Sequence, residues 1–138
     1  MDMIERIEHK EELFAIIIRG EYECNGTKFV TSKESPLQVG LIGRKKGENI
    51  QPHIHKPVTR TIEYTQEFIH ITKGRVVVDF YDVDGSKIKS ATLKSGDSIL
   101  LTGGGHGFQM LEDTRMIEVK QGPYLSVESD KQHLEEKK

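Results

Sequence analysis

The feature of this sequence that most constrains its fold is the alternation of short β-branched stretches with turn-forming glycines and Asp-Gly pairs. Such punctuation is typical of β-strands joined by tight reversals. The strands expected from it cover residues 13–19, 28–31, 37–44, 50–55, 64–72, 75–82, 87–93, 98–101, 107–111 and 115–120. Asp84 and Gly85 predict a hairpin with a type I′ turn, because that turn needs positive φ at its central residues.

No convincing helix separates these strands, which favours an antiparallel barrel or sandwich over parallel β-α-β units. One short helix is expected earlier, over residues 3–12. The apolar stretch 13–18 would be a liability at an exposed sheet edge, so we expect it to be covered. A chain of 138 residues is the usual size of one domain, which we place at residues 1–125. The charged segment 126–138 has few apolar residues and is expected to be a flexible tail.

Composition argues against several classes of partner. The net charge of -2, with both signs interspersed, offers no general attraction for nucleic acid or anionic membrane. The single cysteine, Cys24, excludes an intrachain disulfide and fits a reducing compartment. The first residues are too charged for a signal peptide, and no apolar run approaches the ~18 residues of a membrane helix. We therefore expect a soluble, cytoplasmic protein.

Three histidines carry most of the chemical information. His53 and His55 are two residues apart, so in a strand their side chains share a face and can reach one metal ion. Taken alone, such a pair is as often a pair of surface residues. His106 strengthens the signal, because it follows three glycines whose missing Cβ atoms leave room for a ligand.

A carboxylate accompanies the histidines. In a strand, Glu67 shares one face with Ile69 and Ile71, where a carboxylate is costly to bury unless it is paired or metal-bound. The alternative is that this face is partly open and Glu67 is solvated. Imidazole and carboxylate ligands together suit a divalent ion such as Fe, Mn, Ni or Zn.

These segments resemble the two signature motifs of the cupin superfamily. The first motif is matched by five residues between Gly47 and His53, then His55, and six residues between Glu67 and Gly74. The second is matched by Gly96, Gly104 and His106. The resemblance implies a cupin-type antiparallel β-barrel, or jelly roll. It also implies one divalent metal ion bound by His53, His55, Glu67 and His106.

The sequence departs from the family pattern at several positions. Eleven residues separate His55 from Glu67, and Glu63 has the same parity as Glu67, so alternation alone cannot choose between the two carboxylates. The six-residue spacing to Gly74 favours Glu67. In the second motif, Thr102 replaces proline, one residue fewer precedes the histidine, and Met110 replaces asparagine.

Other residues are candidates for contact with a ligand. Polar candidates near the barrel mouth are Gln51, Arg60, Tyr64 and Gln109, and apolar ones are Phe108 and Met110. Arg60 is suited to an anionic group, since guanidinium pairs bidentately with carboxylate or phosphate. Ile69, Ile71 and Val78 are more readily explained as barrel core. His9, His70 and His133 are expected to lie outside the site.

The resemblance is to small single-domain cupins that are often associated with surface-polysaccharide biosynthesis. It implies an enzyme with isomerase-like or oxygenase-like chemistry on a small oxygenated metabolite, such as a sugar or sugar nucleotide. A non-catalytic metal-containing module that binds or senses a ligand is the alternative, and a scaffold with a vestigial pocket is a third class. The family also implies a homodimer, because cupin barrels commonly pair through edge strands.

Overall fold

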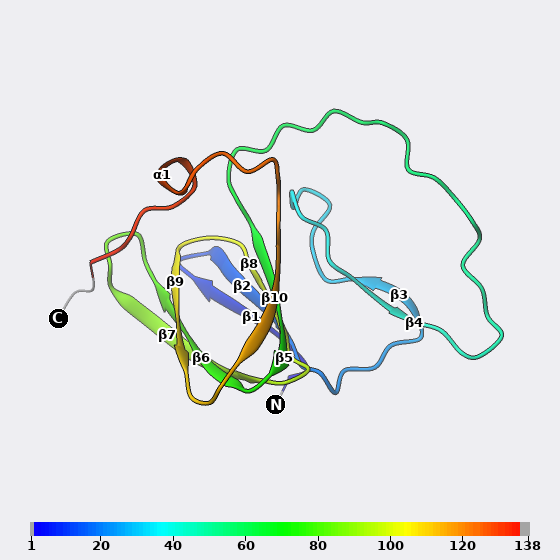
Figure 1. Cartoon of the computed structure of the whole chain (residues 1–138), viewed down its shortest axis with the longest axis horizontal. Helices are drawn as coiled ribbons and strands as arrows, with labels where there is room; N and C mark the ends of the chain where they lie inside the picture. The colour runs from blue at the N-terminus through cyan, green and yellow to red at the C-terminus, as the bar shows by residue number, and fades with distance from the viewer. Residues whose placement is uncertain (1, 136–138) are drawn as a thin grey trace. The chain divides into compact units, whose positions relative to one another are not determined.

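The computed structural model describes residues 2–135, apart from the side chains of residues 129 and 130 (Figure 1). The strands are β1 (Ile4–His9), β2 (Glu12–Ile18), β3 (Gly26–Phe29), β4 (Gly40–Gly43), β5 (Glu67–Lys73), β6 (Arg75–Tyr81), β7 (Lys87–Lys94), β8 (Ser98–Leu101), β9 (Gly105–Met110) and β10 (Arg115–Lys120). The described helical structure is one short turn, α1 (Val127–Asp130). Every described strand pair is antiparallel, which confirms the expected all-β class.

The chain forms two compact units. The first contains Met1–Tyr22 and Thr65–Lys138, and the second contains Glu23–Tyr64. The prediction of one domain over residues 1–125 stays a prediction. No helix among the described residues combines the length and the apolar character needed to cross a membrane.

The first unit contains two antiparallel sheets around one core. One sheet has the order β1-β2-β8-β5-β10 and the other the order β7-β6-β9. Buried side chains from both sheets form a single cluster, which includes Phe14, Ile71, Val78, Phe80 and Leu101. Among the described residues the sheets do not close into one barrel, so the cupin-type jelly roll stays a prediction. The apolar strand β2 lies between β1 and β8, which confirms that it is covered.

The short helix expected over residues 3–12 is wrong. This segment forms β1, which pairs with the apolar strand β2 and directs Ile7 into the core. Lys10 and Glu11 then adopt left-handed backbone conformations, with φ of 50° and 64°, which a right-handed helix cannot contain. The two residues form the tight turn of a β1–β2 hairpin, where the ladder satisfies the backbone groups.

The second unit contains only one short hairpin, in which β3 pairs with β4. The strand expected over residues 50–55 is absent, because residues 48–63 contain neither strand nor helix. Pro52 and Pro57 lack the backbone N–H that a sheet ladder requires. His53 and His55 therefore do not lie in a strand, and strand alternation does not place their side chains on one face.

The remaining expected strands are confirmed, with ends that differ by a few residues. The β6–β7 hairpin is also confirmed, but its turn is different from the type I′ turn expected at Asp84 and Gly85. The Asp82 nitrogen donates to the Ser86 carbonyl, and Gly85 has positive φ, as in a three-residue loop.

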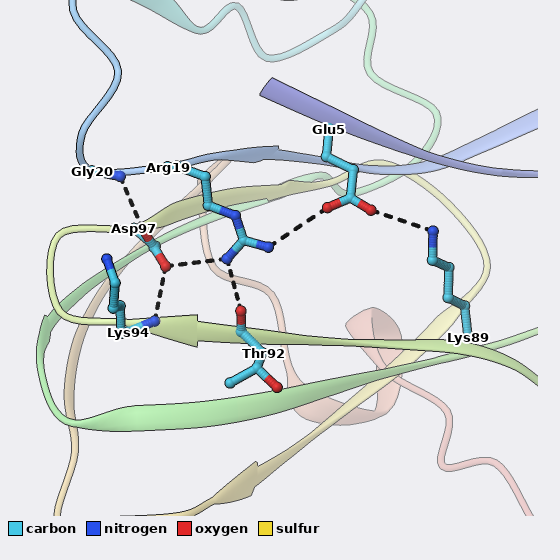
Figure 2. A network of polar contacts seen from close by, with 7 residues as sticks. All are labelled: Glu5, Arg19, Gly20, Lys89, Thr92, Lys94 and Asp97. Carbon is cyan, nitrogen blue, oxygen red and sulfur yellow. Dashed lines mark hydrogen bonds and ion pairs between the residues drawn. The ribbon is translucent and has the colours of Figure 1, made fainter. Parts of the chain in front are cut away.

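A buried polar network fixes one end of the first unit (Figure 2). The fully buried Asp97 carboxylate accepts hydrogen bonds from the backbone nitrogens of Gly20 and Lys94, and from Arg19 Nη1 at 3.2 Å. Arg19 also donates to the Thr92 carbonyl at 2.7 Å. The network therefore ties the end of β2 to the turn between β7 and β8.

Candidate functional site

The first unit has a cavity of about 600 Å³, a size that is usual for small-molecule sites. Its lining combines charged and polar side chains, apolar side chains and the bare backbone of four glycines. The lining residues are Thr65, Glu67, Tyr81, Leu101, Gly103, Gly104, Gly105, His106, Gly107, Phe108, Lys131, Gln132, His133 and Leu134. Glu67 and His106, two of the four expected metal ligands, are among them.

Strand β5 places Glu67 at the cavity. Alternate side chains of a strand share a face, and Ile69 and Ile71 on this face belong to the core. Glu67 continues the same face at the first position of β5, and 16% of its side chain is exposed. The expected parity is therefore confirmed. His70 points to the opposite face, where its Nδ1 lies 2.8 Å from the Ser98 hydroxyl.

The glycine-rich approach to β9 places His106 at the same cavity. Gly104 has φ of 61°, and a Cβ there would collide with the ring of Phe14. The loop can therefore pass directly over Phe14 only because this position lacks a side chain. His106 Nε2 lies 3.8 Å from Glu67 Oε1, and the His106 and Phe108 rings make an edge-to-face contact.

Both groups are disposed toward their neutral forms. Desolvation, followed by a side-chain hydrogen bond and repulsion from Glu118, raises the pKa of Glu67 to about 7. Burial, followed by the positive charge of Lys131, lowers the pKa of His106. The 3.8 Å separation is too long for a hydrogen bond. The two groups therefore share a site that lacks enough positive charge to ionise the carboxyl fully, and a bound cation would supply that charge.

Glu118 is a member of this site that the sequence reading did not identify. It lies opposite Ile69 in the β5–β10 ladder, so its side chain points to the same face as Glu67. The alternation of side chains along β10 could have predicted the face on which Glu118 lies, but Glu118 belongs to no recognised motif. Lys120 lies opposite Glu67 in the same ladder, and its Nζ lies 3.8 Å from Glu118 Oε1.

The other two expected ligands form a second pair within the second unit. The rings of His53 and His55 have centroids 5.3 Å apart and an interplanar angle of 71°. His53 Nδ1 donates to the Gln51 carbonyl at 2.8 Å, because a carbonyl oxygen can only accept. This bond leaves the Nε2 lone pair available, an arrangement that is usual for metal-binding histidines.

The described residues contain no set of three or more His, Cys, Asp or Glu side chains arranged to hold a metal ion. What they contain are two pairs of donors, one in each unit. The pair that includes Glu67 is on strands of the first unit, whereas the rival carboxylate Glu63 is exposed in the second unit.

The expected ligand-contact residues have different surroundings. Phe108 lines the cavity, whereas Met110 is half exposed at the end of β9 and is not among the lining residues. Gln51, Arg60 and Tyr64 belong to the second unit, where they are exposed. Gln109 also lies outside the lining, since its amide donates to Asp79 at 2.6 Å. The roles of Gln51, Arg60, Tyr64 and Met110 stay predictions.

The C-terminal segment supplies four lining residues that the sequence did not assign to the site, and His133 among them was expected to lie outside it. Lys131, Gln132, His133 and Leu134 all border the cavity. The C-terminal segment is charged and has neither strand nor helix periodicity. Its sequence therefore does not indicate what it packs against, and only the structure shows its position at the cavity. The expected flexibility of residues 126–138 stays a prediction.

Comparisons with known proteins add no family or relative. No family model matches the chain, and searches of curated proteins and of solved structures found no match. The interpretation of the site therefore depends on its sequence motifs and its geometry.

Proposed function

We propose that this chain is a cupin-type metal-binding protein that takes a small oxygenated metabolite, such as a sugar or sugar nucleotide, into its cavity. The observation that carries the proposal is the meeting of Glu67 and His106 at one cavity. Glu67 has the spacing that the first cupin motif gives to a metal ligand, and His106 corresponds to the histidine of the second motif with one residue fewer before it.

The geometry of the Glu67–His106 pair is compatible with metal ligation. Two donors that each lie about 2.1 Å from one ion are separated by roughly 3–4 Å, a range that includes the 3.8 Å between Glu67 and His106. The Nε2 atom of His53 is available, as ligation requires. The sequence motif, rather than any described contact, assigns His53 and His55 to the same ion.

A divalent ion held by these side chains would polarise a carbonyl or enediolate oxygen of the ligand. The surrounding residues would shape the cavity around the ligand. Phe108 and Leu101 provide an apolar wall, and the bare backbone around Gly105 allows a ligand to approach closely. Iron with oxygen consumption would indicate an oxygenase, whereas manganese, nickel or zinc without it would indicate an isomerase or a binding module.

A non-catalytic ligand-binding or sensing module is the second candidate. It needs only the cavity and the donors that line it, and no proton-transfer step. Turnover of a keto sugar or sugar nucleotide would exclude it, whereas saturable binding without turnover would support it.

We also propose that the chain forms a homodimer through a sheet edge. Strand β10 is an edge of its sheet, and Ile117 and Val119 on it are exposed. Exposed apolar edge strands are commonly paired or covered. Light scattering at micromolar concentration should give twice the chain mass, and a monomer would contradict this part of the proposal.

The metal proposal is tested by the metal content of protein purified without chelators. We expect close to one ion per chain, and a marked loss in Glu67→Gln, His53→Ala and His106→Ala. His70→Ala is the matched control, because His70 lies on β5 but points away from the cavity. Metal content far below one in the wild type, or equal losses in the control, would contradict the proposal.

A further inference from the structure

Residues 131–134 form part of the cavity wall, although they are far in sequence from either cupin-like motif. The segment is held at both ends. At its start, the Lys131 backbone nitrogen donates to the Val127 carbonyl at 2.9 Å and continues the turn of α1. At its end, Leu134 packs so closely on Gly105 that a Cβ at Gly105 would collide with the Leu134 side chain.

The same segment also lines a second hollow together with the turn between β6 and β7. A smaller pocket of about 300 Å³ is lined by Val83, Asp84 and Gly85 from that turn and by residues 132–135. The segment therefore separates two hollows of the first unit. Its side chains on the larger hollow include one cation, Lys131, and one imidazole, His133.

Lys131 is a cation among the lining residues of the cavity. Among the side chains that the structure describes, its ammonium forms no ion pair, whereas Lys120 on β10 lies near Glu118. A cation held at a cavity wall without a partner is suited to a charge-assisted contact with an anionic group.

We propose that Lys131 is the anion-binding residue of the cavity, so that its ligand is a small metabolite carrying a phosphate or carboxylate group. This inference rests on the proposed function, since it concerns the ligand of the same cavity. It assigns the anionic end of the ligand to the C-terminal segment and the oxygenated end to the Glu67–His106 side. Leu134 has a positioning role, because it fixes the segment on Gly105.

The test compares the binding of glucose 1-phosphate, glucuronate and glucose to the full-length chain by isothermal titration calorimetry. The first two probes distinguish phosphate from carboxylate, and glucose is their neutral counterpart. Lys131→Gln should weaken binding of the preferred anionic probe about tenfold, a change of about 1.4 kcal/mol, and should leave binding of glucose unchanged. Lys89→Gln is the matched control, because Lys89 carries the same charge on β7 and does not line the cavity.

Leu134→Ala provides a second variant that keeps every charge. It should weaken the anionic probe by a smaller factor of about three, by loosening the segment that holds Lys131. Equal effects of Lys131→Gln and Lys89→Gln would overturn the inference. Binding of glucose as tight as that of both anionic probes, or binding of none of the three, would also overturn it.

Metal content measured on the same samples separates the two proposals. Lys131→Gln should retain the wild-type metal content, because Lys131 is not a proposed ligand. A wild-type protein without metal that still prefers an anionic probe through Lys131 would contradict the proposed metal site and support the anion site. A metal-loaded protein that binds charged and neutral probes equally well would support the proposed metal site and contradict the anion site.

Discussion

Glu67 and His106 lie on strands that pack on one core, whereas His53 and His55 lie in a segment without strand or helix. In the first unit, paired strands and buried isoleucines determine where each donor points. In the second unit, a local hydrogen bond from His53 to Gln51 and a ring contact with His55 provide the order. The strand-borne pair should therefore be preorganised, and the other pair should depend more on a bound ion.

The largest expected effect concerns the stability of the strand-built unit. Asp97→Ala removes the closer carboxylate partner of the buried Arg19, which keeps only Glu5 at 3.6 Å, and it leaves two backbone nitrogens without their acceptor. It should therefore lower the free energy of unfolding by about 3–5 kcal/mol. Glu63→Ala, at an exposed position of the second unit, should change it by less than about 0.5 kcal/mol. Urea unfolding measures both, and a cost at Asp97 no greater than that at Glu63 would contradict the comparison.

The next effect tests whether the second pair depends on metal. His53→Ala should leave the stability of the chelator-treated protein within about 0.5 kcal/mol of the wild type. With Zn²⁺ at 100 times its dissociation constant, the wild type should gain about 2.7 kcal/mol, and the variant should lose most of this gain. Thermal unfolding with and without Zn²⁺ gives the answer. An equal gain in both proteins would mean that His53 is not a ligand.

A pH effect distinguishes Glu67 from Glu63. Folding raises the pKa of Glu67 to about 7, mainly by desolvation, so the folded state holds that proton more tightly than the unfolded state. The free energy of unfolding contributed by this group therefore falls as pH rises from about 4.5 to about 7, by on the order of 1–3 kcal/mol.

Glu67→Gln removes this titration from the metal-free protein. The variant should gain stability relative to the wild type across that pH range and keep the gain above it. Glu63→Gln is the matched control and should show no such trend. A stability difference at Glu67 that stays constant between pH 4.5 and pH 8 would show that the carboxyl is not desolvated.

The smallest effect concerns the β1–β2 turn of the strand-built unit. Glu11 has φ of 64°, a conformation that glycine adopts without steric cost. Glu11→Gly should therefore raise the free energy of unfolding by up to about 1 kcal/mol, since type I′ turns favour glycine. Glu12→Gly, one residue later in β2, should lower it. Chemical unfolding of both variants checks the sign.

The parts of the molecule that the sequence predicts well are those with strong periodicity. Strand β5 could be placed, and its inward face identified, because Ile69 and Ile71 alternate with polar residues. The glycines before His106 could be assigned a close approach, and the partner of Gly104 in that approach proved to be Phe14. The regularly spaced glycines predicted where the chain reverses between strands, since many tight turns need a positive φ that few other residues adopt.

The parts that the sequence predicts poorly depend on tertiary partners. The sequence of residues 3–12 was expected to form a short helix, and only its pairing with β2 makes residues 4–9 the strand β1. Residues 50–55 have strand-like composition, but prolines on either side of His55 deprive them of ladder donors. The sequence around Lys131 has no pattern that predicts its position. Only the structure places Lys131 at the cavity, on the segment whose Leu134 packs on Gly105.

The central claim is that the two donor pairs bind one ion, and the EPR spectrum of the Cu²⁺-substituted protein tests it most directly. Imidazole binds Cu²⁺ well, and each bound nitrogen contributes to the hyperfine pattern of a single centre. Coordination by His53, His55 and His106 predicts three imidazole nitrogens, with one lost in His53→Ala and one lost in His106→Ala. A pattern that loses a nitrogen in one of these variants and is unchanged in the other would contradict the claim.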